Sequence, residues 1–393
     1  MARKFDLVIV TAANKAQAAG YRSQLKGREG FLVVPDPGDK RVGSLGATVN
    51  VLRKLTCTAA HPRTAVRLAR GASKPLTASR ILICHSGGDA KRTPAYAALG
   101  KAFVPMTDRR PMLDHIIAEM EKLPAKPGVT ICCGDVIPSL DTKLVKYART
   151  GVTGVAYPDG PWQAQRHGVY VTSSVPRCVS PAAGKRCAEQ PTGTRHSCRV
   201  AEESSSLSPV TAFLQKPHVT RGRHLIDTGI LHIDWATAEK MTKLPIAGDI
   251  YEEFPKLLLE GFAKFSVAVV PTCEFFHIGS SKELLKLLGK PLPRTASRPR
   301  PRRCTALLDA VAAPIAKLGG DNIVTNVPAS YGPISLEKGD CLTSLPLKDG
   351  TWYNLHYRIE NTFKEDGLWD HHDLGAKMRQ IDHKRLLALR KKA

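Results

Sequence analysis

Short, uninterrupted apolar runs mark the first third of the chain. They lie at Asp6–Val10, at Phe31–Val34 ahead of Pro37 and Gly38, at Ile81–Cys84 and at Val129–Cys133. Such runs lack the alternation of a half-exposed strand and are typical of strands that are buried on both faces of a parallel sheet. The pattern therefore predicts a series of buried parallel strands.

Helical spacing appears between these runs. Residues Ala16–Leu25 are predicted to form a helix, and the apolar spacing after Ala47 indicates another. The clearest helix starts at Pro111, and its apolar face consists of Met112, Leu113, Ile116, Ile117, Met120 and Leu123. The alternation of buried strands and helices predicts an α/β fold of the Rossmann-like αβα class.

Small residues follow the predicted strands. They are Ala12 and Ala13 after the first strand, Gly43, Ser44 and Gly46 ahead of the second helix, and Gly87 and Gly88 after the third strand. Ligands of open α/β sheets bind at the carboxyl ends of strands, and glycines let backbone N–H groups face an anion there. An ordinary strand-to-helix turn would look the same, so the glycines alone leave both interpretations open.

Charged residues extend two of these turns. Lys91, Arg92 and Lys101 follow the Gly87 turn and can supply charge to a bound triphosphate, or form a solvated basic edge. Asp135 follows the fourth strand, where a carboxylate can ligate Mg²⁺ beside phosphate oxygens or simply form a turn.

Composition limits the class of protein. With 393 residues, of which 42% are hydrophobic, the chain can bury one large core and a smaller one. No apolar run approaches the roughly 20 residues of a membrane span, and the start MARKFDLVIV lacks the core of a signal peptide, so we expect a cytoplasmic protein without a membrane partner. The net charge of +23 raises nucleic-acid binding as an alternative. The basic clusters contain no interleaved aromatic residues and no RNA or DNA module, which argues against that alternative.

Shifts in composition predict the domain organisation. Residues 1–290 are expected to form one domain, interrupted at 173–208 by a Ser/Pro-rich insertion that is disordered or loosely held. Residues 291–320, rich in proline and arginine, are predicted to be a linker, and residues 321–393 a small, mostly β region with a basic helical tail.

One stretch resembles a known enzyme family. Sugar-nucleotide pyrophosphorylases share the pattern G-x-G-T-R-x-x-P, with a lysine seven positions after the proline. Here Lys101 is seven residues after Pro94, Lys91 takes the place of the arginine, and Asp89 takes that of the second glycine. The wording GGDAKRTP and GKAFVP, together with VTAANKAQAAGY and GSLGATVN, resembles the fucose-1-phosphate guanylyltransferase part of bifunctional fucokinase/fucose-1-phosphate guanylyltransferases.

The resemblance implies an activity and further site residues. It implies a nucleotidyltransferase that forms GDP-L-fucose and pyrophosphate from GTP and fucose 1-phosphate, and a C-terminal region like a reduced left-handed β-helix. It also implies that Lys216, in FLQKP, contacts the sugar phosphate and that Asp227, in IDTGI, holds Mg²⁺ together with Asp135. Asp234 and Asp249 are the next candidates for the metal.

Other interpretations stay open at this point. The same fold can act on another sugar 1-phosphate or nucleoside triphosphate, and the chain can be an inactive homologue. Leu45 replaces a glycine that is usual in the family, and would be strained if that position needed a positive φ. The sequence does not determine the oligomeric state.

Overall fold

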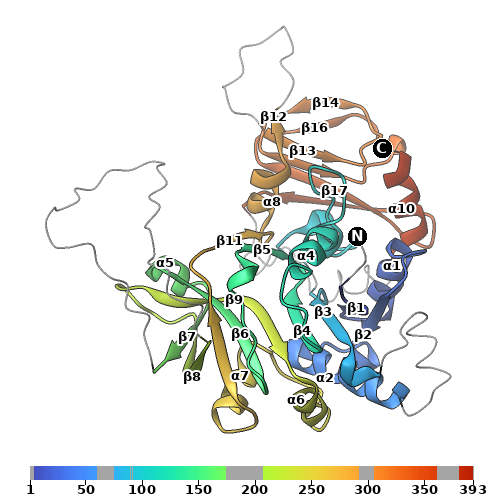
Figure 1. Ribbon diagram of the computed structural model, residues 1–393. Coiled ribbons are helices and arrows are strands. Elements are labelled where there is room, and N and C mark those ends of the chain that lie inside the picture. Colours follow the sequence, from blue (N-terminus) through green and yellow to red (C-terminus); the bar gives the residue numbers. More distant parts are fainter. Residues whose placement is uncertain are drawn as a thin grey trace, which may run out of the picture.

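The structure of the protein is a computed structural model that describes residues 4–59, 75–88, 90, 92–173, 207–291, 305–360 and 380–392. A large α/β part is followed by a smaller, β-rich part, which carries the orange and red colours of Figure 1. Asp89, Lys91, nearly all of the predicted insertion and residues 292–304 of the predicted linker lie outside the described residues.

A nine-stranded mixed sheet forms the centre of the α/β part. Its strand order is β2-β1-β3-β4-β9-β6-β10-β8-β7, and β2, β1, β3 and β4 run parallel to one another. The strands are β1 (Leu7–Ala12), β2 (Phe31–Pro35), β3 (Arg80–His85), β4 (Gly128–Cys133), β6 (Val152–Asp159), β7 (Gly168–Thr172), β8 (Leu207–Gln215), β9 (His224–Ile233) and β10 (Phe265–Val269). The short strands β5 (Val136–Leu140) and β11 (Cys273–His277) pair separately.

Side chains from the sheet pack into two cores. In β1, Val8 and Val10 belong to one core, and Leu7 and Ile9 belong to the other, as the alternation of a strand requires. Helices α1 (Lys15–Gln24) and α4 (Met112–Met120) contribute to the first core, and α2 (Gly43–Ala59), α6 (Trp235–Met241) and α7 (Glu253–Leu259) contribute to the second. The sheet therefore has helices on both faces, as the uninterrupted apolar runs predicted.

Helix α2 begins earlier than the sequence predicted. It starts at Gly43 and not near Ala47, because Gly43 has a φ of 76° and turns the chain into the helix. Leu45 lies in the first turn, does not have a positive φ, and is buried. The concern that leucine would be strained at this position is therefore removed.

The C-terminal part is built from short strands. Its two sheets have the orders β12-β13-β15-β17-β18 and β14-β16. The strands are β12 (Lys290–Pro291), β13 (Thr305–Asp309), β14 (Ile315–Leu318), β15 (Asn322–Thr325), β16 (Ile334–Leu336), β17 (Asp340–Pro346) and β18 (Trp352–Arg358). Strands β13, β15 and β17 pair in parallel, and so do β14 and β16, so the strands from β13 to β17 alternate between the two sheets. The left-handed winding of this arrangement stays a prediction.

The predicted linker at 291–320 is too long. Strands β13 and β14 lie inside it, and Ala306 and Leu307 of β13 are buried. The proline and arginine residues before 304 dominated the sequence pattern and hid the short apolar run that follows them. The basic tail is helical as predicted, since α10 (His383–Lys392) ends the described chain, and two short helices, α5 (Pro161–Ala164) and α8 (Ser281–Leu288), complete the fold.

The two parts of the chain are joined by a polar cluster. The Tyr96 hydroxyl donates to Asp309 Oδ2 at 2.6 Å, and Arg390 of α10 pairs with the same carboxylate. Arg390 also donates to Asn326 Oδ1 at 2.9 Å and lies 5.3 Å from the centre of the Tyr96 ring. Because Tyr96 follows the Gly87 turn and α10 lies beside α1 (Figure 1), the end of the chain is fastened to the first domain.

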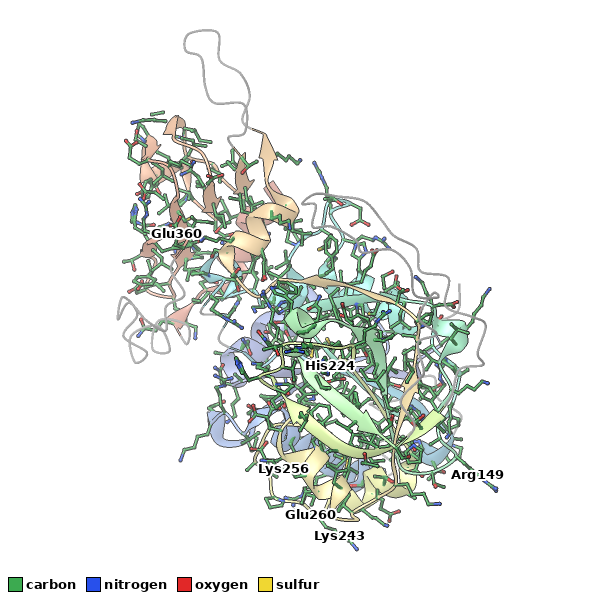
Figure 2. All side chains as sticks on the ribbon, turned by 90° about the vertical axis from the view of Figure 1, so that its left-hand side faces the viewer. Arg149, His224, Lys243, Lys256, Glu260 and Glu360 are labelled. Atoms are coloured by element: carbon green, nitrogen blue, oxygen red, sulfur yellow. The ribbon has the colours of Figure 1, made fainter. Side chains whose placement is uncertain are left out.

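The two parts lie at opposite ends of the molecule. Figure 2 labels Glu360 in the β-rich part, far from Lys243, Lys256 and Glu260 at the other end of the α/β part. In the described part of the chain, every helix is too short or too polar to cross a membrane.

Candidate active site

A cavity of about 400 Å³ opens at the carboxyl ends of the four parallel strands. Ligands of open α/β sheets bind at this edge. The cavity is lined by Thr11, Asp36, Arg41, Gly43, Ser44, Ala47, His85, Ser86, Gly87, Gly88, Ala90, Arg92, Lys101, Gly134, Asp135 and Asp249.

The cavity brings together more than half of the predicted site residues. Those that line it are Gly43, Ser44, Gly87, Gly88, Arg92, Lys101 and Asp135. Ala12, Ala13, Gly46, Lys216 and Asp227 are described but do not line it, and Lys91 lies outside the described residues.

The turn after β3 packs closely onto the end of β1. A Cβ atom at Gly87 would lie 3.3 Å from the backbone of Ala12 and Ala13, which explains why a glycine occupies this position. Tyr21 donates to the Ser86 carbonyl at 2.8 Å, and Gln17 donates to the Gly88 carbonyl at 3.2 Å. These hydrogen bonds and the contact with β1 fix one side of the turn. Its other side faces the cavity.

Ala12 and Ala13 lie against the glycine turn and do not line the cavity. Both are buried beneath the glycine turn, and the Ala13 N–H donates to Gln17 Oε1 at 2.7 Å. Since this N–H already has a partner inside the protein, we assign the two alanines to support of the turn and not to direct contact with a ligand.

Lys101 and Asp135 form the charged centre of the cavity. The Lys101 Nζ lies 3.1 Å from Asp135 Oδ2, and the two side chains are 14% and 29% exposed. Gly100, with a φ of 81°, places Lys101 at the start of a short 3₁₀ helix, where a side chain on Gly100 would collide with Tyr21. An anion that enters the cavity therefore meets a lysine whose position is fixed by the backbone.

His277 is a second partner of Asp135. Its Nε2 lies 3.7 Å from Asp135 Oδ2, and its Nδ1 lies 3.9 Å from Glu283 Oε2. Burial alone would raise the pKa of Asp135, but the hydrogen bond from His277 and the charge of Lys101 outweigh burial and hold this pKa well below its usual range. Asp135 is therefore a carboxylate at neutral pH.

Asp227 lies beside this centre, on β9. It is 7% exposed, and its Oδ1 accepts hydrogen bonds from the Tyr170 hydroxyl at 3.2 Å and from the Gly229 N–H at 3.0 Å. Burial raises its pKa to about 7, and these two hydrogen bonds only partly oppose the rise.

The geometry of the aspartate pair differs from the prediction in one respect. Strand β9 runs antiparallel to β4, with Ile131 opposite Leu231, so Asp227 lies toward the amino end of its strand and not at a carboxyl end. The pairing with β4 ends at this point, and nearer its start β9 pairs with β7, with Val169 opposite Ile226. The pKa of the Cys133 thiol is raised mainly by burial and also by the charges of Asp135 and Asp227. Cys133 therefore lies near both carboxylates.

Two carboxylates alone are too few to hold a metal ion, so Asp135 and Asp227 could bind one only together with oxygens of a ligand. Among the described residues, no group of three or more His, Cys, Asp or Glu side chains could hold a metal ion. Mg²⁺ in phosphate-transfer sites is typically bound by one or two carboxylates, with phosphate and water oxygens as the other ligands. The buried Asp227 carboxylate, which faces no cation in its own hydrogen bonds, suits this arrangement.

Lys216 lies outside the cavity, at the end of β8. It is exposed and has a φ of 47°, and its N–H donates to the His167 carbonyl at 3.1 Å. The pKa of His167 is lowered to about 4, mainly by burial and also by the charges of His277, Arg166 and Lys216. His167 therefore lies between Lys216 and the charged centre at His277 and Asp135. Lys216 thus belongs to a neighbouring face of the same region.

The helix end of the cavity carries two carboxylates, Asp36 and Asp249, beside Arg41. Asp36 follows β2, and Asp249 accepts a hydrogen bond from Ser44 at 2.9 Å. The N–H groups of Leu45 and Gly46 both donate to the Gly248 carbonyl, at 2.9 and 3.4 Å. The first turn of α2 therefore offers a ligand fewer free donors than a usual helix start.

Several cavity residues were missed by the sequence analysis. Asp36 and His85 follow the apolar runs of β2 and β3, and no role was predicted for either residue. His85 lies 3.0 Å from Thr48 Oγ1, and burial lowers its pKa to about 4, so it is neutral at pH 7. Of the two reserve metal candidates, Asp249 lines the cavity, whereas Asp234 caps α6 by accepting from the Thr237 N–H at 2.8 Å.

The fold and the cavity define a class: an open α/β domain with a ligand site that combines a glycine turn, cations and carboxylates at the carboxyl ends of parallel strands. Within this class, residues 73–249 match the family model of the fucose pyrophosphorylase domain. This stretch of the chain is thus similar to the fucose pyrophosphorylase domain, and the resemblance predicted from its motifs is confirmed.

Curated relatives have corresponding names. The bifunctional fucokinase/GDP-fucose pyrophosphorylase of Arabidopsis thaliana is 29% identical over 269 residues, which cover 58% of this chain and 23% of the relative. The fucose-1-phosphate guanylyltransferase of Mus musculus is 30% identical over 187 residues, covering 43% of this chain and 30% of the relative. The L-fucokinase/L-fucose-1-P guanylyltransferase of Bacteroides fragilis is 22% identical over 403 residues, covering 86% and 38%. The chain therefore spans less than two fifths of the length of each relative.

Proposed function

We propose that the protein is a nucleotidyltransferase that forms GDP-L-fucose and pyrophosphate from GTP and fucose 1-phosphate. The observation that carries the proposal is the pair of Lys101 and Asp135 beside the Gly87 turn, in a cavity at the ligand-binding edge of the sheet. These three residues all lie inside the range that matches the fucose pyrophosphorylase domain. The relatives named above support the choice of sugar and base.

The reaction requires positioning and charge neutralisation. A phosphate oxygen of fucose 1-phosphate attacks the α-phosphorus of GTP, a new P–O bond forms, and the bond to the β-phosphate breaks, so that pyrophosphate leaves with its electron pair. No protein nucleophile is required for this exchange. In our proposal, the glycine turn, Arg92 and Lys101 hold the triphosphate and stabilise the charge that develops on its oxygens, and Lys91 is a further candidate from the sequence.

The remaining site residues have supporting roles in the proposal. Asp135 and Asp227 would hold Mg²⁺, which would neutralise phosphate charge when bound. His277 keeps Asp135 in place through the contact described above. Lys216 orients the sugar phosphate from the neighbouring face, consistent with its position near His167 and His277.

The proposal is tested by measuring pyrophosphate release across a panel of nucleoside triphosphates and sugar 1-phosphates. We expect GTP with fucose 1-phosphate to give the highest kcat/KM. Replacing Lys101 by alanine should reduce turnover at least about tenfold, because a charge-assisted contact to phosphate contributes about 1.5 to 3 kcal/mol.

A matched lysine provides the control for this variant. Lys122 is exposed and, among the described residues, pairs only with Glu119, at 2.6 Å on the surface of the molecule, so Lys122→Ala should keep full turnover. Equal rates for Lys101→Ala and Lys122→Ala would refute the triphosphate assignment. Absence of turnover with every substrate pair would refute the proposed activity itself.

A further inference from the structure

The two ends of the cavity have opposite charge. The end at the β3 turn carries Arg92 and the Lys101–Asp135 pair, whereas the end at α2 carries the carboxylates of Asp36 and Asp249 together with Arg41, whose charge acts on Asp36. A nucleoside triphosphate that places its phosphates at the cationic end points its base toward the carboxylates. The acidic end therefore suits a base that donates hydrogen bonds.

Asp36 is a buried carboxylate, and one of its two oxygens accepts no hydrogen bond from the described residues. The residue is only 7% exposed, it lines the cavity, and its backbone N–H donates to the Ala12 carbonyl at 2.8 Å, which fixes its position at the end of β2. Its Oδ2 accepts one long hydrogen bond, from the Val42 N–H at 3.3 Å, and within the described residues its Oδ1 accepts none. Burial raises its pKa to about 6, so folding gains little from its charge.

Asp249 is already satisfied by the protein. Its Oδ2 accepts from the Ser44 hydroxyl at 2.9 Å, and its Oδ1 accepts from the Tyr251 N–H at 2.7 Å. Asp249 therefore fixes the start of α2. Both of its oxygens already accept a hydrogen bond, whereas Asp36 keeps one oxygen for a ligand.

Among the four common bases, guanine presents two neighbouring donors on one edge, its N1–H and its 2-amino group. A carboxylate can accept both at once, as it does from the two parallel donors of an arginine. Adenine and cytosine present a single amino group beside an acceptor nitrogen, and uracil presents one N–H between two carbonyl groups.

We propose that Asp36 selects guanine, by accepting hydrogen bonds from its N1–H and its 2-amino group. This inference rests on the proposed function, since it assumes that the cavity holds a nucleoside triphosphate with its phosphates beside Lys101. A buried polar group that requires a partner from the ligand can discriminate strongly against a base that lacks that partner.

The first test uses the unaltered protein and inosine triphosphate, which keeps the N1–H but lacks the 2-amino group. We expect calorimetric titration to give a Kd for inosine triphosphate about tenfold or more weaker than that for GTP, which is the effect of one hydrogen bond to a charged group. Equal affinities for the two nucleotides would overturn the proposal without any need for a variant.

The second test is Asp36→Asn with xanthosine triphosphate, whose base carries a carbonyl in place of the 2-amino group. Asparagine offers one acceptor and one donor, which match the N1–H and this carbonyl. We expect the variant to lose affinity for GTP, to gain affinity for xanthosine triphosphate, and so to reverse the preference of the unaltered protein. An unchanged ratio of the two Kd values in a folded variant would contradict the proposal.

Asp249→Asn is the matched control, because it makes the same chemical change on the same wall of the cavity. It should lower affinity for all nucleotides together and should not favour xanthosine triphosphate; a reversal of preference here would assign selection to Asp249. The two proposals can fail separately. A preference for guanine in binding without pyrophosphate release would refute the proposed activity alone. Turnover with GTP and with inosine triphosphate at equal kcat/KM would refute the role of Asp36 alone.

Discussion

Replacing Asp227 by asparagine should raise the melting temperature of the metal-free protein at pH 8 and, in the same protein, reduce turnover at least about a hundredfold. The stability gain follows from burial. Because the pKa of Asp227 in the folded protein is about 7, against 3.8 for a free side chain, its charged form opposes folding by roughly 4 kcal/mol at high pH.

The direction of this pH dependence is fixed by the raised pKa. Asp227 favours folding most below about pH 4, and that contribution is lost as the pH rises through about 7. Asparagine removes the charge and keeps the structure, since both hydrogen bonds, from Tyr170 and from Gly229, go to Oδ1, which asparagine retains. The gain in stability should therefore be measurable by thermal unfolding at pH 8 with a chelator, and should vanish near pH 4.

Asp135→Asn is the contrasting variant. The pKa of Asp135 is depressed, so its charge favours folding above about pH 4, and its removal leaves the partly buried Lys101 without its partner. The same chemical change should therefore lower the melting temperature at position 135 and raise it at position 227, while turnover falls in both. If Asp227→Asn keeps full metal-dependent turnover, the metal is held elsewhere, and Asp249 is then the candidate that faces the cavity.

The second large effect is expected far from the cavity, at the end of the chain. Arg390→Ala should destabilise the protein by about 2 to 4 kcal/mol and also slow turnover. The side chain of Arg390 is 13% exposed, and its removal leaves Asp309, at 21% exposure, without a charged partner in a largely buried place. Tyr96, which donates to the same carboxylate, is fully buried and precedes Lys101 by five residues.

Arg385 on the same helix serves as the control. It donates to the Gly350 carbonyl at 2.9 Å and lies 5.0 Å from the centre of the Trp352 ring, both on the surface. Arg385→Ala should change the midpoint of denaturant unfolding little. A wild-type midpoint for Arg390→Ala would show that the polar cluster does not fasten the two parts together. Loss of stability without loss of kcat would show that this cluster does not position Lys101.

Much of the first domain could be predicted from local pattern. The run Ile81–Cys84 became the centre of β3, and the apolar face after Pro111 became α4, because both elements are buried strongly enough for sequence periodicity to determine them. The glycine turn could also be located, since a strand followed by Gly87, Gly88 and cations is a local signal. Lys101 was a candidate as a cation after this turn, and its spacing from Pro94 in a family motif supported that assignment.

The sequence could not show contacts that join distant segments. The start of α2 depends on the carbonyl of Gly248, the direction of β9 depends on its neighbours in the sheet, and Asp36 reaches the cavity because β2 pairs in parallel with β1. Strand β13 was hidden for a related reason, since its burial comes from pairing with β15 and not from its own flanks. Local composition carries no information about such partners.

The contact between α2 and the segment around Gly248 also bears on the order in which the protein matures. Ser44 bonds to Asp249 across 205 positions of sequence, so the wall that holds the acidic end of the cavity is incomplete until the chain beyond residue 249 has been synthesised. Contacts of such high sequence separation form late and slow folding, because the intervening chain must first be ordered. A nascent chain that already displays the glycine turn therefore still lacks a closed nucleotide cavity. During synthesis, the exposed edge of its half-built sheet is the surface that a chaperone is expected to protect.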